Sequence, residues 1–342
     1  MINGRIVILD SGSPAHRAIF ETGRMKILKR EGKIPSSTLI LPCHYTYLNI
    51  ILSMLKRIVI RPDDTVIIAC DARKSWRKFY YPIYKGNRNE LRSSHDEINW
   101  TEEYQKIEEI NLKLHQATDW HFIKISDFIN GHNIRNLSCL FDIEYSNEQL
   151  ENKYGIEADD IIATICKYNQ DKEIVIVTGD GDLEMLCEYP NVKYFSTNLK
   201  YKKQKGSWKN VVDPLKILAK KIKKGDASDN ILVDKENDTD REIEIRKLII
   251  DLFNLPSFVE EPIKNIILHL PKKEMNYDLM PLQTSLGKPE KFGRIYMDTN
   301  QVTWEMSMIE NEKKLLEKKE KNKERNKIVY AKKKSEREKA LR

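Results

Sequence analysis

Carboxylates follow three short apolar runs of the chain. Each run ends in aspartate or is followed directly by it, at Asp10, Asp71, Asp180 and Asp182. Such runs are typical of buried strands in a parallel sheet, and ligands of open α/β sheets collect beyond the carboxyl ends of the strands. We therefore expect these side chains to meet at one edge of a sheet and to hold a metal ion there.

The stretch at residues 174–182 has a second interpretation. Asp180 and Asp182 flank a glycine, and aspartate and glycine are ordinary turn residues, so a strand followed by a polar turn is the plain alternative to a metal site. An EF-hand loop is excluded, because Met185 stands at the sixth position, where that loop needs glycine.

Two more acidic groups favour the metal site. One falls in the expected first turn of a helix and the other in a turn rich in small residues: Glu157, Asp159 and Asp160, and then Asp226 and Asp229. Acids in a first helical turn also serve the helix dipole, which is the plain alternative for the first group. Magnesium prefers oxygen ligands, whereas the five cysteines lack a C-x-x-C pair and the seven histidines show no metal-ligand spacing.

A basic and aromatic segment follows the second aspartate. Its members include Arg73, Lys74, Arg77, Lys78, Tyr84, Lys85, Arg88 and Arg92. Basic side chains neutralise phosphates and aromatic faces accept stacked bases, so this composition suits a nucleic-acid strand. A solvated helix with half-buried tyrosines is the alternative interpretation.

Composition limits the class of protein. The 342 residues carry a net charge of +7, and residues 311–342 alone hold 14 Lys or Arg against 6 Asp or Glu, so a basic tail follows a nearly neutral body. No apolar run reaches the length of a membrane span, and the start lacks a signal-peptide layout. Together with the scattered cysteines, this predicts a soluble protein of the cytoplasm. The usual nucleotide-cofactor motifs are absent.

The hydrophobic pattern predicts the scaffold, which is an α/β fold with a central, mostly parallel sheet flanked by helices. A serine N-cap and Pro14 explain the start of the first helix. Helices are expected over residues 14–29, 45–60, 101–117, 214–224, 239–254 and 260–270. Residues 192–197 are expected to form an outer strand and residues 118–153 to be irregular. A linker or loop over 271–295 and a charged, helical or disordered tail complete the chain.

Six short pieces match the 5′-to-3′ exonuclease and flap endonuclease family, in that family's order. They are Ile8-Leu9-Asp10 with Arg17-Ala18, Cys70-Asp71, Tyr84-Lys85-Gly86-Asn87-Arg88, Gly155 to Asp160, Thr178 to Leu183, and Gly225 to Asn230. The chain resembles the family over about residues 5–231. Within it, the chain is most similar to the ribonuclease H branch of T-even bacteriophages, through Lys74-Ser75, Trp76 to Tyr81 and Tyr189 to Lys193. It departs from cellular members at 231–240, which lacks the glycines of a helix-hairpin-helix.

The resemblance implies roles for the acidic residues and for two cations. One Mg²⁺ would be held by Asp10, Asp71, Glu157 and Asp159, and a second by Asp180, Asp182 and Asp229. Asp160 and Asp226 would act indirectly or through water, and Mn²⁺ would substitute for Mg²⁺. Lys85 and Arg88 match positions that approach the scissile phosphate and are the expected catalytic side chains.

The resemblance also implies a nucleic-acid surface and an organisation into regions. The residues expected to bind nucleic acid are Arg17, Arg73, Lys74, Arg77, Lys78, Tyr84, Lys202, Lys203, Lys223 and Lys224. A nuclease domain of the PIN/flap-nuclease type would span 1–198, with a helical arch at about 74–117. A basic, helical DNA-binding region at 199–270 and the linker and tail at 271–342 would follow.

The implied activity is Mg²⁺-dependent 5′-to-3′ exonuclease and flap endonuclease cleavage of DNA and RNA–DNA duplexes, removing RNA primers during phage lagging-strand replication. Expected partners are duplexes with 5′ ends or flaps and a single-stranded-DNA-binding protein or sliding clamp; the chain is expected to be monomeric. The alternative is a branched-DNA binding accessory protein without catalysis. A dehalogenase-like phosphatase is disfavoured, because Ser11-Gly12 follows Asp10 where that class needs a second aspartate. A single-metal flap-binding member is a closer rival.

Overall fold

The computed structural model describes residues 4–61, 63–93, 98–137, 144–197, 207–233 and 238–271. The chain divides into two compact units, residues 1–282 and 283–342. The expected linker and tail therefore lie almost wholly outside the described residues, as do Lys202 and Lys203. None of the described helices combines the length and the apolar character needed to cross a bilayer.

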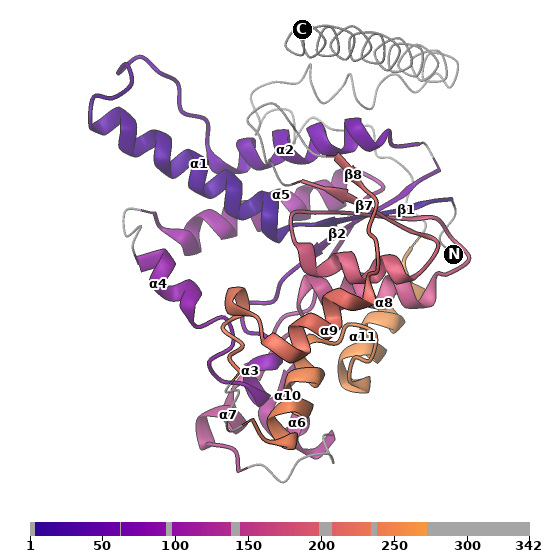
Figure 1. Ribbon diagram of the computed structural model, residues 1–342. Coiled ribbons are helices and arrows are strands. Elements are labelled where there is room, and N and C mark those ends of the chain that lie inside the picture. Colours follow the sequence, from indigo (N-terminus) through magenta and orange to yellow (C-terminus); the bar gives the residue numbers. More distant parts are fainter. Residues whose placement is uncertain are drawn as a thin grey trace, which may run out of the picture. The chain divides into compact units, whose positions relative to one another are not determined.

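The main sheet has the predicted class, because five of its six strands are parallel (Figure 1). Its strands are β1 (Ile6–Asp10), β2 (Thr65–Cys70), β3 (His121–Lys124), β6 (Ile174–Thr178), β7 (Val192–Ser196) and β8 (Ser207–Lys209). They lie in the order β3-β2-β1-β6-β7-β8, with only β8 antiparallel. Strands β2, β1 and β6 are neighbours, so the three carboxyl ends followed by aspartate lie side by side.

The central strands form where they do because their apolar runs can be buried on both faces. Every residue of β1 and β6 is buried, and so are five of the six residues of β2. A central parallel strand covered on both sides is expected to read as a continuous hydrophobic run, without alternation. A second, two-stranded sheet pairs β4 (Ile129–Asn130) with β5 (Lys153–Tyr154).

Helices cover both faces of the sheet (Figure 1). The helices α1 (Gly12–Arg30), α2 (Cys43–Ile58) and α5 (Trp100–Ala117) pack against one another on one face. On the other face, α8 (Ala158–Tyr168) packs against β1 and β2 and against α11 (Ser257–Leu268). The remaining helical elements are α3 (Arg77–Tyr80), α4 (Asn87–Ser93), α6 (Gly131–Leu137), α7 (Asn147–Glu151), η1 (Gly181–Glu188), α9 (Leu215–Lys224), η2 (Ala227–Asp229) and α10 (Asp240–Ile250).

All six expected helices are present, with ends shifted by a few residues. A serine does stand at the N-cap of the first helix, as expected, but its side chain does not cap the helix. Ser11 precedes α1 but makes no side-chain capping bond, because its hydroxyl instead hydrogen bonds with the Tyr47 hydroxyl of α2 at 2.8 Å. The helix start is therefore held to a neighbouring helix through that pair.

The prediction that 118–153 is irregular was wrong in part. This stretch supplies β3, which extends the main sheet beyond β2, as well as α6, α7 and the short second sheet. Its strands are only four and two residues long and contain polar residues, so they carry too little periodicity to be recognised. Strand β7 is not outermost either, because β8 pairs with its free edge.

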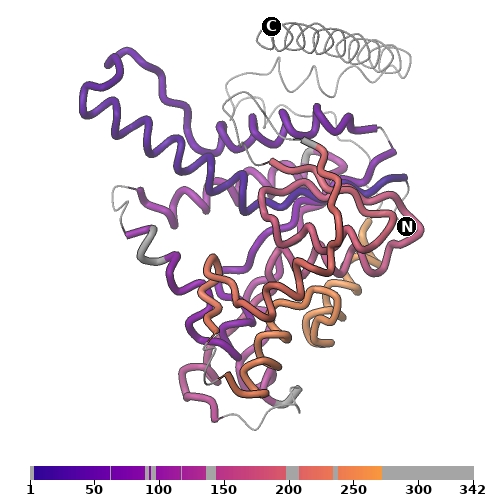
Figure 2. Tube along the Cα trace, viewed as in Figure 1, coloured from indigo at the N-terminus to yellow at the C-terminus, as the bar shows by residue number. Residues whose placement is uncertain are grey.

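The expected arch at about 74–117 is only partly separate from the sheet domain. Ile107, Ile110 and Leu114 of α5 are buried, and this helix packs against α1, α2 and β3. Helix α5 therefore belongs to the layer that covers the sheet. The turn around residues 81–88 lies beside the turn at 226–232, although the two are far apart in sequence (Figure 2).

Candidate metal centre

Strand ends bring the first carboxylates together, as predicted. Asp10 is the last residue of β1. Its two carboxylate oxygens accept hydrogen bonds from Gly12 N at 2.8 Å and from Thr178 Oγ1 of β6 at 2.6 Å. Asp71 follows β2 and accepts from Ala158 N of α8 at 2.9 Å. A Cβ at Gly12 would lie 3.2 Å from Asp10 Oδ1 and 3.7 Å from Asp71 Oδ2, so both carboxylates border this glycine.

The start of α8 adds Glu157, Asp159 and Asp160, and the last two have different surroundings. Burial, and after it the charges of Asp180, Asp10 and Asp71, raises the pKa of Asp159. Asp160 is completely buried and accepts two hydrogen bonds from Arg77, at 2.6 and 2.9 Å, and one from Trp76 Nε1 at 2.9 Å. Both oxygens of Asp160 are therefore bound by Arg77 or Trp76, and the indirect role expected for this residue remains a prediction.

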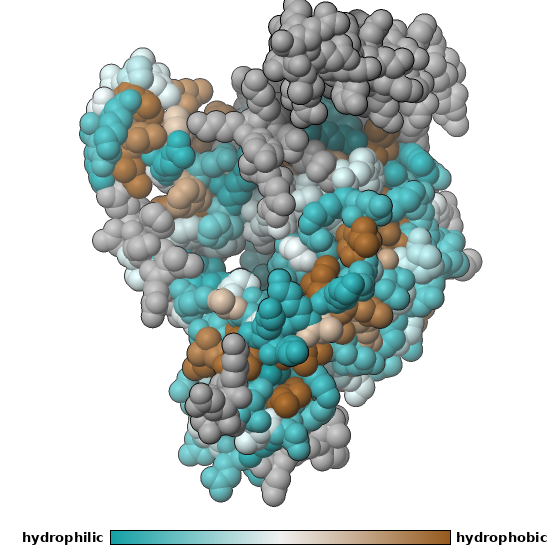
Figure 3. All heavy atoms as spheres, viewed as in Figure 1, coloured by the Kyte–Doolittle hydropathy of each residue, from teal (hydrophilic) through white to brown (hydrophobic). Residues whose placement is uncertain are grey.

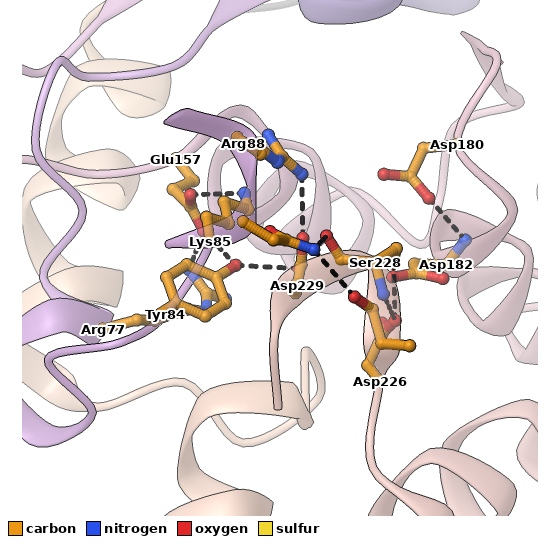
Figure 4. Close-up of polar contacts among 12 residues, drawn as sticks. Arg77, Tyr84, Lys85, Arg88, Glu157, Asp180, Asp182, Asp226, Ser228 and Asp229 are labelled. Carbon is orange, nitrogen blue, oxygen red and sulfur yellow. Dashed lines mark hydrogen bonds and ion pairs between the residues drawn. The ribbon is translucent and has the colours of Figure 1, made fainter. Parts of the chain in front are cut away.

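A further group of carboxylates belongs to the site (Figure 4). Oxygens of Asp182, Asp226 and Asp229 all lie within 4.8 Å of one another, and this is the one such group of potential metal ligands within the described residues. Asp182 comes from η1, and the other two come from the turn around η2. Asp226 was expected to act indirectly, but it is part of this cluster. Asp180 is not one of the three, and its carboxylate instead accepts a hydrogen bond of 2.8 Å from the backbone amide of Asp182.

Removal from water and mutual repulsion make ionisation of these groups unfavourable. Burial and the neighbouring Asp71 raise the pKa of Asp10 to about 6. Partial burial and Asp180 raise the pKa of Asp182 to about 7, and the pKa of Asp159 is also raised. Crowded carboxylates shift in this direction unless positive charge neutralises them. An all-oxygen donor set of this kind fits a hard divalent cation.

Protein cations already neutralise part of the cluster (Figure 4). Lys85 Nζ lies 2.6 Å from Glu157 Oε1, and Arg88 Nη2 lies 2.8 Å from Asp229 Oδ1. Although burial acts to raise the pKa of Glu157, Lys85 and Arg77 together hold it down at about 2. Glu157 is therefore ionised throughout the ordinary pH range.

Tyr84 and Arg77 lie where a nucleic-acid strand cannot reach them. Tyr84 is 2% exposed, and its hydroxyl lies 2.9 Å from Glu157 Oε2 and 3.1 Å from Asp229 Oδ2. Arg77 is also 2% exposed and binds Glu157, Asp160 and the carbonyl oxygen of Ile249. Their expected contacts with nucleic acid are corrected by this burial: both residues hold the acidic residues in position instead.

The other basic residues expected to bind nucleic acid are more accessible. Arg73, Lys223 and Lys224 are exposed, while Lys74 and Lys78 are half-buried. Arg17 is half-buried on α1 and pairs with Glu21 at 2.9 Å. Their roles in binding remain predictions.

Three contributors to the site were missed in the sequence. Lys221 of α9 contacts both Asp182 and Asp226, Thr178 binds Asp10, and Ser228 donates to Asp226 from its backbone and hydroxyl at 2.9 and 2.5 Å. Lys221 stands in a helix with four other lysines, so composition gave no reason to single it out. The serine after an aspartate in a tight turn is a recognisable signal.

Comparison with known proteins finds structural likeness without a sequence match. No protein-family model matches the sequence, and no curated protein matches it significantly. Among solved structures, it is similar to the crystal structure of T5 D15 protein co-crystallised with metal ions, at 16% identity and a TM-score of 0.47. The match covers 78% of this chain and 100% of that chain. A structural likeness at this identity and TM-score does not identify a function.

Proposed function

We propose that this protein is a Mg²⁺-dependent 5′-to-3′ exonuclease and flap endonuclease that acts on DNA and RNA–DNA duplexes. The observation that carries the proposal is the meeting of acidic residues from three adjacent strand ends, the start of α8 and the turn around η2, next to Lys85 and Arg88. A site that combines many carboxylates with two cationic side chains suits phosphodiester hydrolysis. The replication role, removal of RNA primers, follows only from the sequence resemblance.

The carboxylates form two groups that suit two cations. Asp10, Asp71 and Asp159 would hold one of them, with Glu157 beside them. The cluster of Asp182, Asp226 and Asp229 would hold the other, together with Asp180, whose carboxylate accepts a hydrogen bond from Asp182 N. Bound Mg²⁺ supplies an activated water and neutralises charge on the attacking and leaving oxygens. Thr178 and Gly12 keep the Asp10 carboxylate oriented through hydrogen bonds of 2.6 and 2.8 Å.

Lys85 and Arg88 would bind and orient the phosphate that is cleaved. Both side chains already contact acidic residues of the site, because Lys85 pairs with Glu157 and Arg88 pairs with Asp229. A phosphate entering between them would gain charge-assisted hydrogen bonds that strengthen as negative charge develops. Lys85 has a φ of 55°, an uncommon conformation for a residue with a side chain, and such strain is often found at functional sites.

Exposed basic residues offer contacts for the rest of a duplex. Lys223 and Lys224 end α9 next to the acidic turn, and Arg73 follows Asp71 by two residues. The space-filling view shows a hollow on this face between the α4 region and the α9 region, bordered by hydrophilic side chains (Figure 3). Contacts of this kind bind phosphate without reading sequence and weaken as salt rises.

The test is cleavage of a 5′-flapped duplex and of an RNA primer annealed to DNA, with Mg²⁺ or with EDTA. The variants are Asp180→Asn and, as a matched control, Asp171→Asn, whose carboxylate is 72% exposed and lies outside the site. Short products released from the 5′ end by the unmodified protein and by Asp171→Asn, but neither by Asp180→Asn nor with EDTA, would support the proposal. Tight binding of the flap without cleavage would instead favour the branched-DNA binding accessory protein.

A further inference from the structure

Lys221 of α9 lies inside the group of carboxylates that we assign to the second cation. Its ammonium contacts Asp182 on one side and Asp226 on the other. The side chain is 16% exposed, and α9 packs against η1, the element that carries Asp182. Lysine is positively charged at neutral pH, and this charge lies between two carboxylates.

The third carboxylate of the group is occupied by other protein groups. Asp229 is contacted by Arg88 at 2.8 Å and by the Tyr84 hydroxyl at 3.1 Å. Asp226 also accepts from the backbone and hydroxyl of Ser228. All three carboxylates thus have partners within the protein, and Lys221 is the group that joins two of them.

We propose that the Lys221 ammonium and the second divalent cation compete for the same carboxylate oxygens, so that this cation binds only when Lys221 moves away. The proposal rests on the proposed function for the identity of the cation. The carboxylate oxygens all lie within 4.8 Å of one another. An ammonium and a divalent cation bound to the same oxygens would therefore be close together and would repel each other strongly.

Lysine suits this role better than arginine would. Its ammonium is a compact charge on a flexible four-carbon stem, whereas the planar guanidinium binds carboxylates in a fixed fork. Lys221 therefore holds Asp182 and Asp226 together without a cation and can still be displaced by one. A consequence is that the need to displace Lys221 from Asp182 and Asp226 weakens binding of the second cation.

The test measures cation binding without nucleic acid, using Mn²⁺ and the full chain. Electron paramagnetic resonance of free Mn²⁺ gives the number of sites and their dissociation constants. Lys221→Met and Lys221→Gln remove the charge, Lys221→Arg keeps it, and Lys220→Met is the matched control, because Lys220 is the preceding residue of the same helix and is exposed. Circular dichroism establishes that each variant is folded.

The unmodified protein and Lys220→Met should each bind one Mn²⁺ tightly and a second one weakly, and Lys221→Arg should bind the second Mn²⁺ no more tightly than they do. Lys221→Met and Lys221→Gln should bind the second Mn²⁺ about tenfold more tightly, which corresponds to about 1.4 kcal/mol. An unchanged or weaker second site in both neutral variants would overturn the inference and leave the proposed function standing. No Mn²⁺ binding by the unmodified protein would overturn both.

Discussion

The backbone amide of Lys85 donates a hydrogen bond of 2.8 Å to the carbonyl oxygen of Asp229. This bond joins the turn that carries the expected phosphate ligands to the turn that carries two of the acidic residues. Asn230 Nδ2 donates to the Ile83 carbonyl at 2.8 Å, and Asn87 Nδ2 donates to the Ala227 carbonyl at 3.0 Å, so the two turns are held together at several points. The position of Lys85 therefore depends on the acidic turn.

Asn230→Ala should weaken this connection. Asn230 has a φ of 58°, which asparagine tolerates better than alanine, and the change also removes the bond to Ile83. We expect a loss of about 1–3 kcal/mol in the free energy of unfolding, from the lost hydrogen bond and the backbone strain. Urea unfolding measures it, with Asn254→Ala as the control, whose amide bonds only locally to Asp251. Equal stability of the two variants would contradict a structural link at Asn230.

Arg77→Met should destabilise the protein, because it leaves Asp160 and Glu157 buried without their partner. Breaking one side of a buried ion pair costs about 3–5 kcal/mol. Thermal unfolding measures the effect, with Lys78→Met, the half-buried neighbour in α3, as the control. Arg77→Lys should recover only part of the loss, since lysine cannot reproduce the double contact with Asp160. A stable variant with weakened nucleic-acid binding would instead restore the surface role predicted from sequence.

Much of the fold was predictable, because the informative runs are local. The apolar runs at 6–10, 65–70 and 174–178 predicted buried parallel strands, and their trailing aspartates predicted where the site would lie. The adjacency of these three strands is a property of sheet topology, and strand periodicity does not reveal it. Strand β3 was missed because four residues that include His121 and Lys124 show no continuous run.

The acidic residues that lie near one another could be selected from the sequence as candidates, but the residues that contact them could not. Arg77 and Tyr84 look like any basic or aromatic residue of a surface segment, and only the folded chain shows that both are 2% exposed among carboxylates. Lys221 and Asp226 are near each other in sequence, yet the contact of Lys221 with Asp182 depends on how α9 packs against η1. Contacts of this kind arise between distant segments, so residue types and spacing do not reveal them.

Lys85→Ala should reduce cleavage far more than it reduces cation binding. Lys85 contacts Glu157, but Arg77 still neutralises that carboxylate in the variant, so the acidic group should keep its shape. Losing one preorganised positive group at a reacting phosphate costs about 100- to 1000-fold in rate. Single-turnover cleavage and Mn²⁺ binding separate the two effects. A parallel fall in both would mean that Lys85 mainly organises the carboxylates.

Removing divalent cations should make stability depend on pH in a defined direction. Asp10 and Asp182 have pKa values raised from 3.8 to about 6 and about 7, so the cation-free folded protein favours their protonated forms. A raised pKa contributes stability at low pH that is lost as the pH rises through the folded value. The contribution of Asp10 alone is about 3 kcal/mol, at about 1.4 kcal/mol per pKa unit. In EDTA, the stability contributed by these two groups should fall between about pH 4 and pH 8.

Magnesium should reverse this trend, because a cation binds the ionised carboxylates and so gains affinity as they lose their protons. Differential scanning fluorimetry at about pH 5 and about pH 8, with EDTA or Mg²⁺, measures the shift in Tm. Mg²⁺ should raise Tm more at the higher pH, and the difference between the two pH values should shrink in the double variant Asp10→Asn, Asp182→Asn. A Mg²⁺ shift that is the same at both pH values would mean that the cation does not bind these two carboxylates.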